Sequence, residues 1–300
     1  KKVYLTGHTG FKGSWLSLWL QNMGALVKGY SLDVNTKPAL FTEANVSAEM
    51  ESEIGDIRNY ADVRSAIDEV DIVINAAALK QVPTCEYFPE QAIKTNALGV
   101  QNIVRAISES NVKVETVIGI STDKAAKPIN VMGMTKALQE RIIIAGNIRN
   151  PDTRSICVRY GNVIASRGSV IPLFHHQIEE GGPVTVTVPD MTRFLLTLNQ
   201  AVDTIFHALG NASAGEIIVP NAPSVTVMNL AKALVEDKDV DIEITGIRPG
   251  EKLHEIMVSE EEANTTSAKG NYYAIRPMLP ELINDDFVPA LNKEFSSEDN

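Results

Sequence analysis

Three evenly spaced glycines after a short apolar segment constrain this chain more than any other feature. Val3–Leu5 is predicted to be a strand, Gly7, Gly10 and Gly13 follow at intervals of three, and an apolar helix is expected from about Ser14. Glycines at such a turn let backbone N–H groups approach a pyrophosphate at the positive end of the helix. By itself the spacing is a weak signal, because a plain turn can contain the same glycines.

Strand-like apolar runs alternate with longer amphipathic stretches through the first half of the chain. The runs after the glycine turn are Leu26–Tyr30, Asp71–Asn75 and Glu115–Ile120. Parallel neighbouring strands need crossovers, and these crossovers are right-handed helices. The alternation therefore predicts an α/β fold with a Rossmann-like, doubly wound parallel sheet over residues 1–160.

Beyond about Tyr160 the order of elements becomes irregular. Short strands, a Gly-Gly-Pro turn at 181–183 and an isolated helix at 227–235 are typical of a smaller, separate layer. We predict a substrate-binding lobe built mainly from residues 161–300, with some later segments returning to the sheet. The two parts are expected to pack as one unit, and the tail from Asn284 is expected to be loosely ordered.

Composition and charge exclude several classes of protein. Of the 300 residues, 44% are hydrophobic and 22% charged, as in soluble globular chains, and the net charge is −11. This charge disfavours nucleic acids and anionic membranes, so an anionic ligand needs a local positive site. The uncharged stretch Gly13–Val27, 15 residues long, is too short to cross a bilayer. We expect a cytoplasmic protein, although the start at Lys1 leaves a trimmed leader open.

The cysteines and histidines give no sign of a metal site. Cys85 and Cys157 fit reduced structural thiols better than a disulfide framework or zinc ligands. His175 and His176 are adjacent, so on a helix they point apart. The remaining histidines are scattered, and no metal is predicted.

Two further segments strengthen the case for a dinucleotide site. Asp56 follows a further apolar segment that lies between the runs at 26–30 and 71–75, and its carboxylate is expected to meet an adenine amino group. Ala76–Ala78 ends the next strand with small residues that admit a cofactor. An acid at the end of the second strand favours a free 2′-hydroxyl. The expected position there is Ser31, with Asp33 two residues on, so both NAD and NADP stay open.

These motifs resemble the extended short-chain dehydrogenases/reductases that act on nucleotide sugars. Residues Thr6–Leu16 are similar to CDP-glucose 4,6-dehydratases, whereas most of the chain from Asn75 onward resembles UDP-N-acetylglucosamine 4,6-dehydratases of polysaccharide biosynthesis. The longer resemblance rests on Ala76–Pro83, Lys94–Asn96, Ser121–Ala125, Arg159–Val163, Ser166–Pro172, Met191–Phe194 and Arg248–Lys252. With the glycine turn it predicts a cofactor site formed by Gly7, Thr9, Gly10, Phe11, Gly13, Ser31, Asp33, Asp56, Ile57, Ala76, Ala77, Ala78 and Lys136.

One departure from the superfamily pattern bears on activity. The usual Tyr-x-x-x-Lys pair appears as Met132 and Lys136, which the spacing still places on one helical face. A thioether cannot carry a proton, so a non-catalytic binding protein is an alternative. The resemblance implies that a branch of these dehydratases keeps activity with Met at this position, and that Lys136 holds the nicotinamide ribose.

The segment Thr122-Asp123-Lys124 follows a predicted strand at the edge of the sheet where ligands of such folds bind. A 4,6-dehydration oxidises C4, removes water across C5 and C6, and returns the hydride to C6. We predict Lys124 as the base for the C5 proton, with a lowered pKa, and Asp123 as the acid for the C6 oxygen, with a raised pKa. Thr122 is expected to relay the proton of the C4 hydroxyl, in part replacing the missing Tyr.

The resemblance also implies the residues that hold the substrate, a UDP-sugar. These are Lys80, Met132, Asn162, Arg167, Ser169, Val170, Arg193, Arg248 and Glu251. Arg suits a diphosphate because its fork of N–H groups meets the oxygens in pairs. The predicted activity is a UDP-N-acetylglucosamine 4,6-dehydratase, assembled as a homo-oligomer. A UDP-hexose or UDP-N-acetylhexosamine 4-epimerase, a CDP-glucose 4,6-dehydratase and a non-catalytic binding module are the competing hypotheses.

Overall fold

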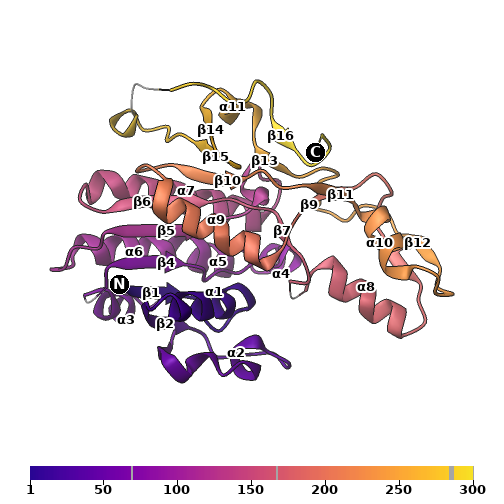
Figure 1. Ribbon diagram of the computed structural model, residues 1–300, viewed down its shortest axis with the longest axis horizontal. Helices are drawn as coiled ribbons and strands as arrows, with labels where there is room; N and C mark the ends of the chain where they lie inside the picture. Colours follow the sequence, from indigo (N-terminus) through magenta and orange to yellow (C-terminus); the bar gives the residue numbers. More distant parts are fainter. Residues whose placement is uncertain (69, 167, 284–286, 300) are drawn as a thin grey trace.

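A computed structural model of the chain describes residues 1–68, 70–166, 168–283 and 287–299 (Figure 1). Within these residues nine strands form one sheet in the order β14-β15-β10-β6-β5-β4-β1-β2-β3. In this order, the seven strands between β10 and β3, both included, run parallel. β15 and β14 extend the sheet beyond β10 as antiparallel strands. The strands are β1 (Lys2–Thr6), β2 (Leu26–Ser31), β3 (Glu51–Ile54), β4 (Ile72–Asn75), β5 (Thr116–Ile120), β6 (Arg154–Val158), β10 (Ile217–Pro220), β14 (Thr266–Lys269) and β15 (Tyr272–Ile275).

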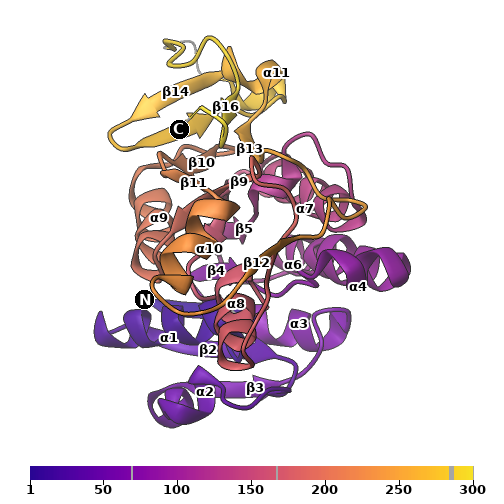
Figure 2. The ribbon, with the colours of Figure 1, turned by 90° about the vertical axis from the view of Figure 1, so that its right-hand side faces the viewer.

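Helices cover both faces of this sheet (Figure 2). α1 and α9 contact each other on one face, and α3, α6 and α7 pack together on the other. The central strands are therefore buried on both sides, and residues such as Leu5, Val73 and Ile118 are fully inaccessible to solvent. The predicted doubly wound, Rossmann-type fold is confirmed. The helices are α1 (Phe11–Asn22), α3 (Tyr60–Ile67), α6 (Gly99–Ser108), α7 (Val131–Arg149) and α9 (Leu198–Asn211), with short α2 (Leu40–Glu43), α4 (Val82–Tyr87) and α5 (Pro89–Ala92) outside them.

A smaller lobe is formed by elements that follow residue 161. It contains the three-stranded sheet β11-β9-β7, the pair β12-β8 and the helices α8 and α10, and a core around Phe174 and Met191 that is separate from the main one. The helix predicted at 227–235 is present as α10. β10, β15 and β14 belong to the main sheet. The bounds are β7 (Asn162–Val163), α8 (Val170–Glu179), β8 (Val184–Val186), β9 (Thr192–Leu196), β11 (Ser224–Thr226), α10 (Val227–Val235) and β12 (Ile242–Ile244).

The C-terminal segment is more ordered than the sequence suggested. β16 (Phe295–Ser296) pairs with β13 (Ile256–Val258), next to the short helix α11 (Glu260–Ala263). Ser297 is fully buried, because hydrogen bonds attach it to residues of the lobe. The expectation of a loose tail is therefore wrong for residues 295–297, whereas Asn284 and the two residues after it lie outside the described part.

Candidate active site

The glycine turn between β1 and α1 has the geometry of a phosphate cradle. Gly7 has a φ of +75°, and a Cβ there would lie 2.8 Å from the backbone of Ala76 and Ala77; a Cβ on Gly13 would lie 2.0 Å from the Gly7 carbonyl oxygen. α1 begins at Phe11 without a side-chain cap and without an acidic residue in its first turn. Its first N–H groups and its dipole therefore suit an anion, so the turn fits a pyrophosphate.

The far end of the turn meets Ser31 and not Asp33. The Thr9 hydroxyl lies 2.9 Å from the Ser31 hydroxyl and donates to the carbonyl of Leu32 at 2.8 Å. The Asp33 side chain is exposed and accepts a hydrogen bond from the backbone N–H of Val34. The carboxylate expected to bind a ribose thus lies outside the turn, and this end of the site gives no reason to prefer NAD over NADP.

Asp56 has a protein partner that sequence reasoning missed. Its carboxylate accepts hydrogen bonds from the side chain and the backbone N–H of Arg58, and these bonds lower the pKa of Asp56. An adenine amino group would have to share a carboxylate that Arg58 already occupies. Ile57 is buried against Gly99, so its side chain belongs to the core and only its backbone is left for a cofactor. Ala76–Ala78 follows β4 directly, beside Gly7.

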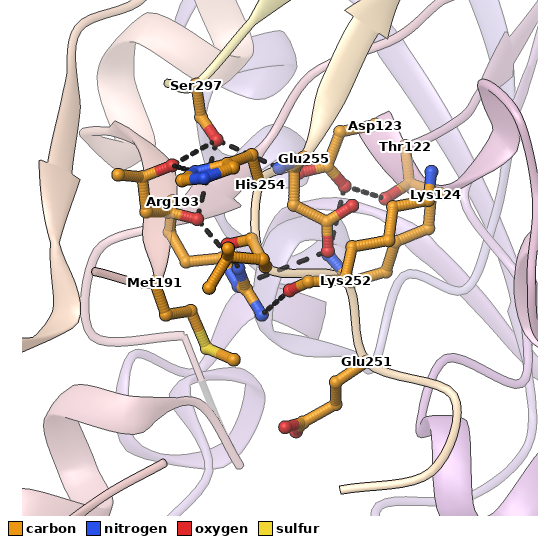
Figure 3. A network of polar contacts seen from close by, with 12 residues as sticks. Thr122, Asp123, Lys124, Met191, Arg193, Glu251, Lys252, His254, Glu255 and Ser297 are labelled. Carbon is orange, nitrogen blue, oxygen red and sulfur yellow. Dashed lines mark hydrogen bonds and ion pairs between the residues drawn. The ribbon is translucent and has the colours of Figure 1, made fainter. Parts of the chain in front are cut away.

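Thr122, Asp123 and Lys124 come together just beyond β5, at the carboxyl end of the parallel sheet. Asp123 is fully buried; its Oδ1 accepts from the Thr122 hydroxyl at 2.8 Å and from Lys124 Nζ at 3.1 Å, while Oδ2 has no hydrogen-bond partner among the described residues. Lys124 Nζ also lies 3.0 Å from Glu255 Oε1 (Figure 3). The structure therefore brings the three predicted residues together and adds a second carboxylate.

The charge state of Lys124 differs from the expectation. Burial by itself would lower the pKa of Lys124, but the charges of Asp123 and Glu255 outweigh it and raise this pKa. The lowered pKa expected for a base is therefore wrong for this structure. Asp123 contributes most to the rise, and Glu255, which lies far from Lys124 in sequence and meets it only in the folded chain, adds to it.

Lys136 lies on the helix α7, and its side chain reaches the end of β5. Its Nζ donates to the carbonyl of Ile120 and to Gln139 Oε1, both at 2.6 Å, and burial lowers its pKa to about 8. Met132, one turn earlier, packs into a small apolar cluster with Cys85 and Ala92. The predicted contacts of Lys136 with a ribose and of Met132 with a sugar stay predictions.

Lys12 of the glycine turn is a further member of the site that sequence reasoning missed. Its Nζ lies 4.6 Å from the ring centroid of Tyr160. Burial, together with the charges of Lys80 and Lys136, lowers its pKa to about 7, and Asp123 and Lys124 also interact with it electrostatically. The glycine turn and the Asp123–Lys124 cluster are therefore parts of one site. A lysine between the second and third glycines was the available signal.

The residues predicted to hold the substrate are spread over the lobe and the loop after β4. Asn162 lies on β7, and its buried Oδ1 has no hydrogen-bond partner among the described residues. Ser169 precedes α8, which Val170 begins, and Lys80 is exposed after β4. Arg167 lies outside the described residues.

The side chains of Arg193 and Arg248 differ in solvent exposure and in the protein contacts that hold them. Arg193 donates to the backbone carbonyls of Thr192, Lys252 and Leu253, so it supports the chain that leads to Glu255. The Arg248 side chain is 66% exposed and pairs with Glu251 at 3.2 Å. The Arg248 side chain is therefore mostly open to solvent. Its turn is nevertheless fixed, because Asn130 at the start of α7 donates to the Gly250 carbonyl.

Metal-binding and membrane-spanning features are missing from the part of the chain that the structure describes. No group of His, Cys, Asp or Glu residues there is arranged to hold a metal ion. None of the helices in the same residues combines the length and apolar character that crossing a bilayer requires. Cys85 and Cys157 are buried free thiols, and burial raises the pKa of both.

Fold and site together define an enzyme class, the extended short-chain dehydrogenases/reductases that modify nucleotide sugars. Within it, the chain belongs to the polysaccharide biosynthesis protein family, whose model matches residues 27–277. The glycine turn precedes the residues that this family model matches, so the family match does not include it.

Individual proteins agree with this membership. A UDP-glucose 4-epimerase of Rickettsia prowazekii is 44% identical over 285 residues, which cover 92% of this chain and 82% of that protein. The crystal structure of Pen from Bacillus thuringiensis superimposes with a TM-score of 0.90 at 32% identity, covering 99% of this chain and 93% of Pen. The dTDP-glucose 4,6-dehydratase DesIV of Streptomyces venezuelae, solved with NAD bound, shares the fold, with a TM-score of 0.75, 20% identity and coverage of 84% and 87%.

Proposed function

We propose that this chain is a nucleotide-sugar 4,6-dehydratase that converts UDP-N-acetylglucosamine to a UDP-4-keto-6-deoxy-N-acetylhexosamine. The observation that carries the proposal is the cluster of Thr122, Asp123 and Lys124, in which Asp123 is fully buried and the other two residues are partly buried. A dehydration needs an acid and a base in addition to the groups that oxidise C4. This cluster provides both a carboxyl group and an amine at the edge of the sheet where the substrate of such a fold binds.

The cofactor of the proposed reaction is NAD or NADP. The glycine turn fits a pyrophosphate, and Gly7, Thr9, Gly10, Phe11, Gly13, Ser31, Ala76, Ala77, Ala78 and Lys136 are the residues proposed to line the site. DesIV, which shares the fold, was solved with NAD bound. When bound, the nicotinamide would accept a hydride from C4 and return it to C6.

Thr122 and Asp123 form a path for the proton that leaves the C4 hydroxyl. Thr122 donates to Asp123 Oδ1 at 2.8 Å, so a proton taken from O4 passes through this hydroxyl to the carboxylate. Asp123 then carries the proton that the C6 oxygen needs to depart as water. The proton removed in the first half of the reaction is thus the one used in the second half.

Lys124 is the proposed base for the C5 proton, which the neighbouring C4 ketone makes acidic. Its Nζ hydrogen-bonds Asp123 Oδ1 at 3.1 Å, so the two groups that act on C5 and on the C6 oxygen are adjacent. Arg248, Glu251, Asn162 and Arg167 are the proposed contacts to the UDP group. A cytoplasmic location and a homo-oligomer belong to the same proposal.

The main competing function is a 4-epimerase, because the Rickettsia prowazekii relative is named a UDP-glucose 4-epimerase. An epimerase shares the oxidation at C4 but needs no acid for C6 and no base for C5. In that case the partly buried Lys124 has only a structural role. Two less favoured functions are a CDP-glucose 4,6-dehydratase and a non-catalytic binding module, the second of which Met132 suggests.

One experiment separates these functions. The purified chain is incubated with UDP-N-acetylglucosamine and, in parallel, with UDP-glucose and CDP-glucose, and the products are analysed by mass spectrometry and NMR. We expect loss of one water from UDP-N-acetylglucosamine without net consumption of cofactor. An isomer of unchanged mass would instead assign the epimerase, water loss from CDP-glucose alone the CDP-glucose dehydratase, and binding without any product the non-catalytic module.

A further inference from the structure

Glu255 is a buried carboxylate that comes from the C-terminal part of the chain and meets Lys124. Its side chain is 3% exposed, and Oε1 lies 3.0 Å from Lys124 Nζ and 4.0 Å from Arg193 Nε. Its other oxygen, Oε2, is buried and has no hydrogen-bond partner among the described residues. A buried carboxylate with half of its acceptors unused is costly, so a role in structure alone accounts poorly for it.

The position of Glu255 is fixed by its backbone and not by Lys124. Its N–H donates to Ser297 Oγ at 2.9 Å, and the Ser297 N–H donates to its carbonyl at 2.8 Å. Ser297 is held in turn by the Thr192 hydroxyl at 2.7 Å. Arg193 supports the preceding residues through their carbonyls. These bonds fix the backbone of Glu255 without any contribution from Lys124.

The charged groups around Glu255 leave Lys124 as its natural partner for a proton. Lys124 is in contact, the Arg193 guanidinium cannot give up a proton, and Lys252 interacts only electrostatically while its Nζ donates to the Ala126 carbonyl. His254 is turned to the Thr192 hydroxyl. On its other side Lys124 meets Asp123, so one ammonium group lies between two carboxylates.

We propose that Glu255 is a positioning residue and the proton partner of Lys124: it holds the ammonium group in the site and takes up its proton so that Lys124 can act as a base. The inference rests on the proposed dehydratase. Once Asp123 has accepted the O4 proton it is neutral, and Glu255 is the remaining carboxylate in contact with Lys124. A proton moves from Nζ to the Glu255 carboxylate and leaves a neutral amine.

The elimination then balances within the cluster. The amine takes the C5 proton, the electrons of the C5–H bond form the C5–C6 double bond, and the C6–O bond breaks as Asp123 gives its proton to the departing oxygen. Nζ later returns a proton to C5, and Glu255 returns its proton to Nζ. Asp123 and Glu255 end ionised and Lys124 ends protonated, as at the start.

The variant Glu255→Gln tests this directly, because it keeps the shape and removes the charge. The pKa of Lys124 is measured by NMR titration of ¹³C-labelled lysine, with Lys124→Arg identifying the resonance. We expect this pKa to fall by about 1–3 units, since a carboxylate in contact is lost. Glu294→Gln, which removes the partner of the partly exposed Lys127, is the matched control and leaves the pKa of Lys124 unchanged.

Activity gives the second readout. Water loss by Glu255→Gln at pH 7 is expected to fall about 100-fold or more and to recover as pH rises through the lowered pKa of Lys124, while cofactor reduction persists. Glu255→Asp is expected to restore part of the neutral-pH activity. An unchanged pKa, or an equal loss at every pH, overturns the proposal. If the wild type dehydrates no sugar but the pKa shifts, the proposed function fails and the pairing stands without a catalytic purpose, which overturns the proton-partner role.

Discussion

Two buried clusters in this molecule have the same composition, one cation between two carboxylates, and differ in how completely they are paired. Arg159, which is 1% exposed, donates to all four oxygens of Glu140 and Glu262 and to the Met257 carbonyl. In the other cluster Asp123 and Glu255 each keep one buried oxygen that has no partner among the described residues. A complete cluster has no acceptor left for a ligand, whereas the incomplete one has two.

The choice of cation agrees with this difference. A guanidinium group is planar, offers five N–H donors and stays protonated, so Arg159 joins α7 to α11 as a permanent charge. An amine can exchange a proton with a neighbouring carboxylate, and Lys124 has two within reach. The first arrangement suits stability and the second suits proton transfer.

The largest effect is expected when the incomplete cluster loses its cation, Lys124. Lys124→Ala is expected to lower water loss and solvent-deuterium exchange at C5 by about 100- to 10,000-fold, because no base is left. Reduction of the bound cofactor by the sugar is expected to persist, since C4 oxidation comes before C5 deprotonation. Mass spectrometry follows the first two quantities and absorbance of the reduced nicotinamide the third. Dehydration at the wild-type rate would contradict the assignment.

The corresponding change in the complete cluster is expected to affect stability and not chemistry. Arg159→Met leaves Glu140 and Glu262 buried without their cation, so the free energy of unfolding should fall by about 3–5 kcal/mol. Urea unfolding measures this, and the activity per folded molecule should be unchanged. Lys113→Met, which removes an exposed cation 3.9 Å from Asp152, is the control and should cost less than about 1 kcal/mol.

The stability that the Arg159–Glu262 pair contributes should also depend on pH, and the direction follows from the pKa of Glu262. Burial opposes ionisation of Glu262, but the charge and hydrogen bonds of Arg159 outweigh it and lower the pKa of Glu262 below 4.5. The ionised form is thus favoured by folding; its stabilisation is present above pH 4.5 and is lost as pH falls through the lowered pKa. Arg159→Met should lose this acid-side dependence, and a variant as acid-sensitive as the wild type would contradict the pairing.

Much of the site was predictable because its signals are local in sequence. The glycine spacing predicts the turn between β1 and α1, since a Cβ on Gly13 would meet the backbone of Gly7 and His8 in the same turn. Thr122-Asp123-Lys124 lies directly after a buried strand, so its place at the sheet edge follows from the topology. The helix at 227–235 begins after Thr226, whose side chain caps it, and this too is local.

The parts that could not be predicted depend on segments that meet only in the folded chain. Asp123 raises the pKa of Lys124 from the next position in the chain, but Glu255 adds to this rise from the C-terminal part, and no spacing in the sequence relates Glu255 to Lys124. Ser297 is ordered by Thr192 and Glu255, so the tail looked loose when considered alone. Arg58 was within reach of sequence reasoning, because it stands two residues after Asp56 with the opposite charge.

A smaller effect is expected when the proton path alone is broken. Thr122→Val removes the hydroxyl that donates to Asp123 Oδ1 and leaves Lys124 between its carboxylates. Oxidation at C4, followed as the rate of cofactor reduction, should slow by about 100-fold, and the pKa of Lys124 should not move downward. Thr122→Ser, which keeps the hydroxyl, should retain most of the rate. If Thr122→Val oxidises the sugar normally, the O4 proton takes another route.

The smallest expected effect tests whether Glu255 is held by the C-terminal strand. Ser297→Ala removes the hydroxyl that accepts from the Glu255 N–H and leaves the backbone bond between the two residues intact. One lost hydrogen bond costs about 1 kcal/mol, or roughly fivefold in the rate of water loss if the whole cost falls on the position of Glu255. The same rate loss should vanish in the Glu255→Gln background, because there Ser297 has no carboxylate to position. A double-mutant cycle measures this coupling, and additive losses would show that Ser297 stabilises the lobe without acting through Glu255.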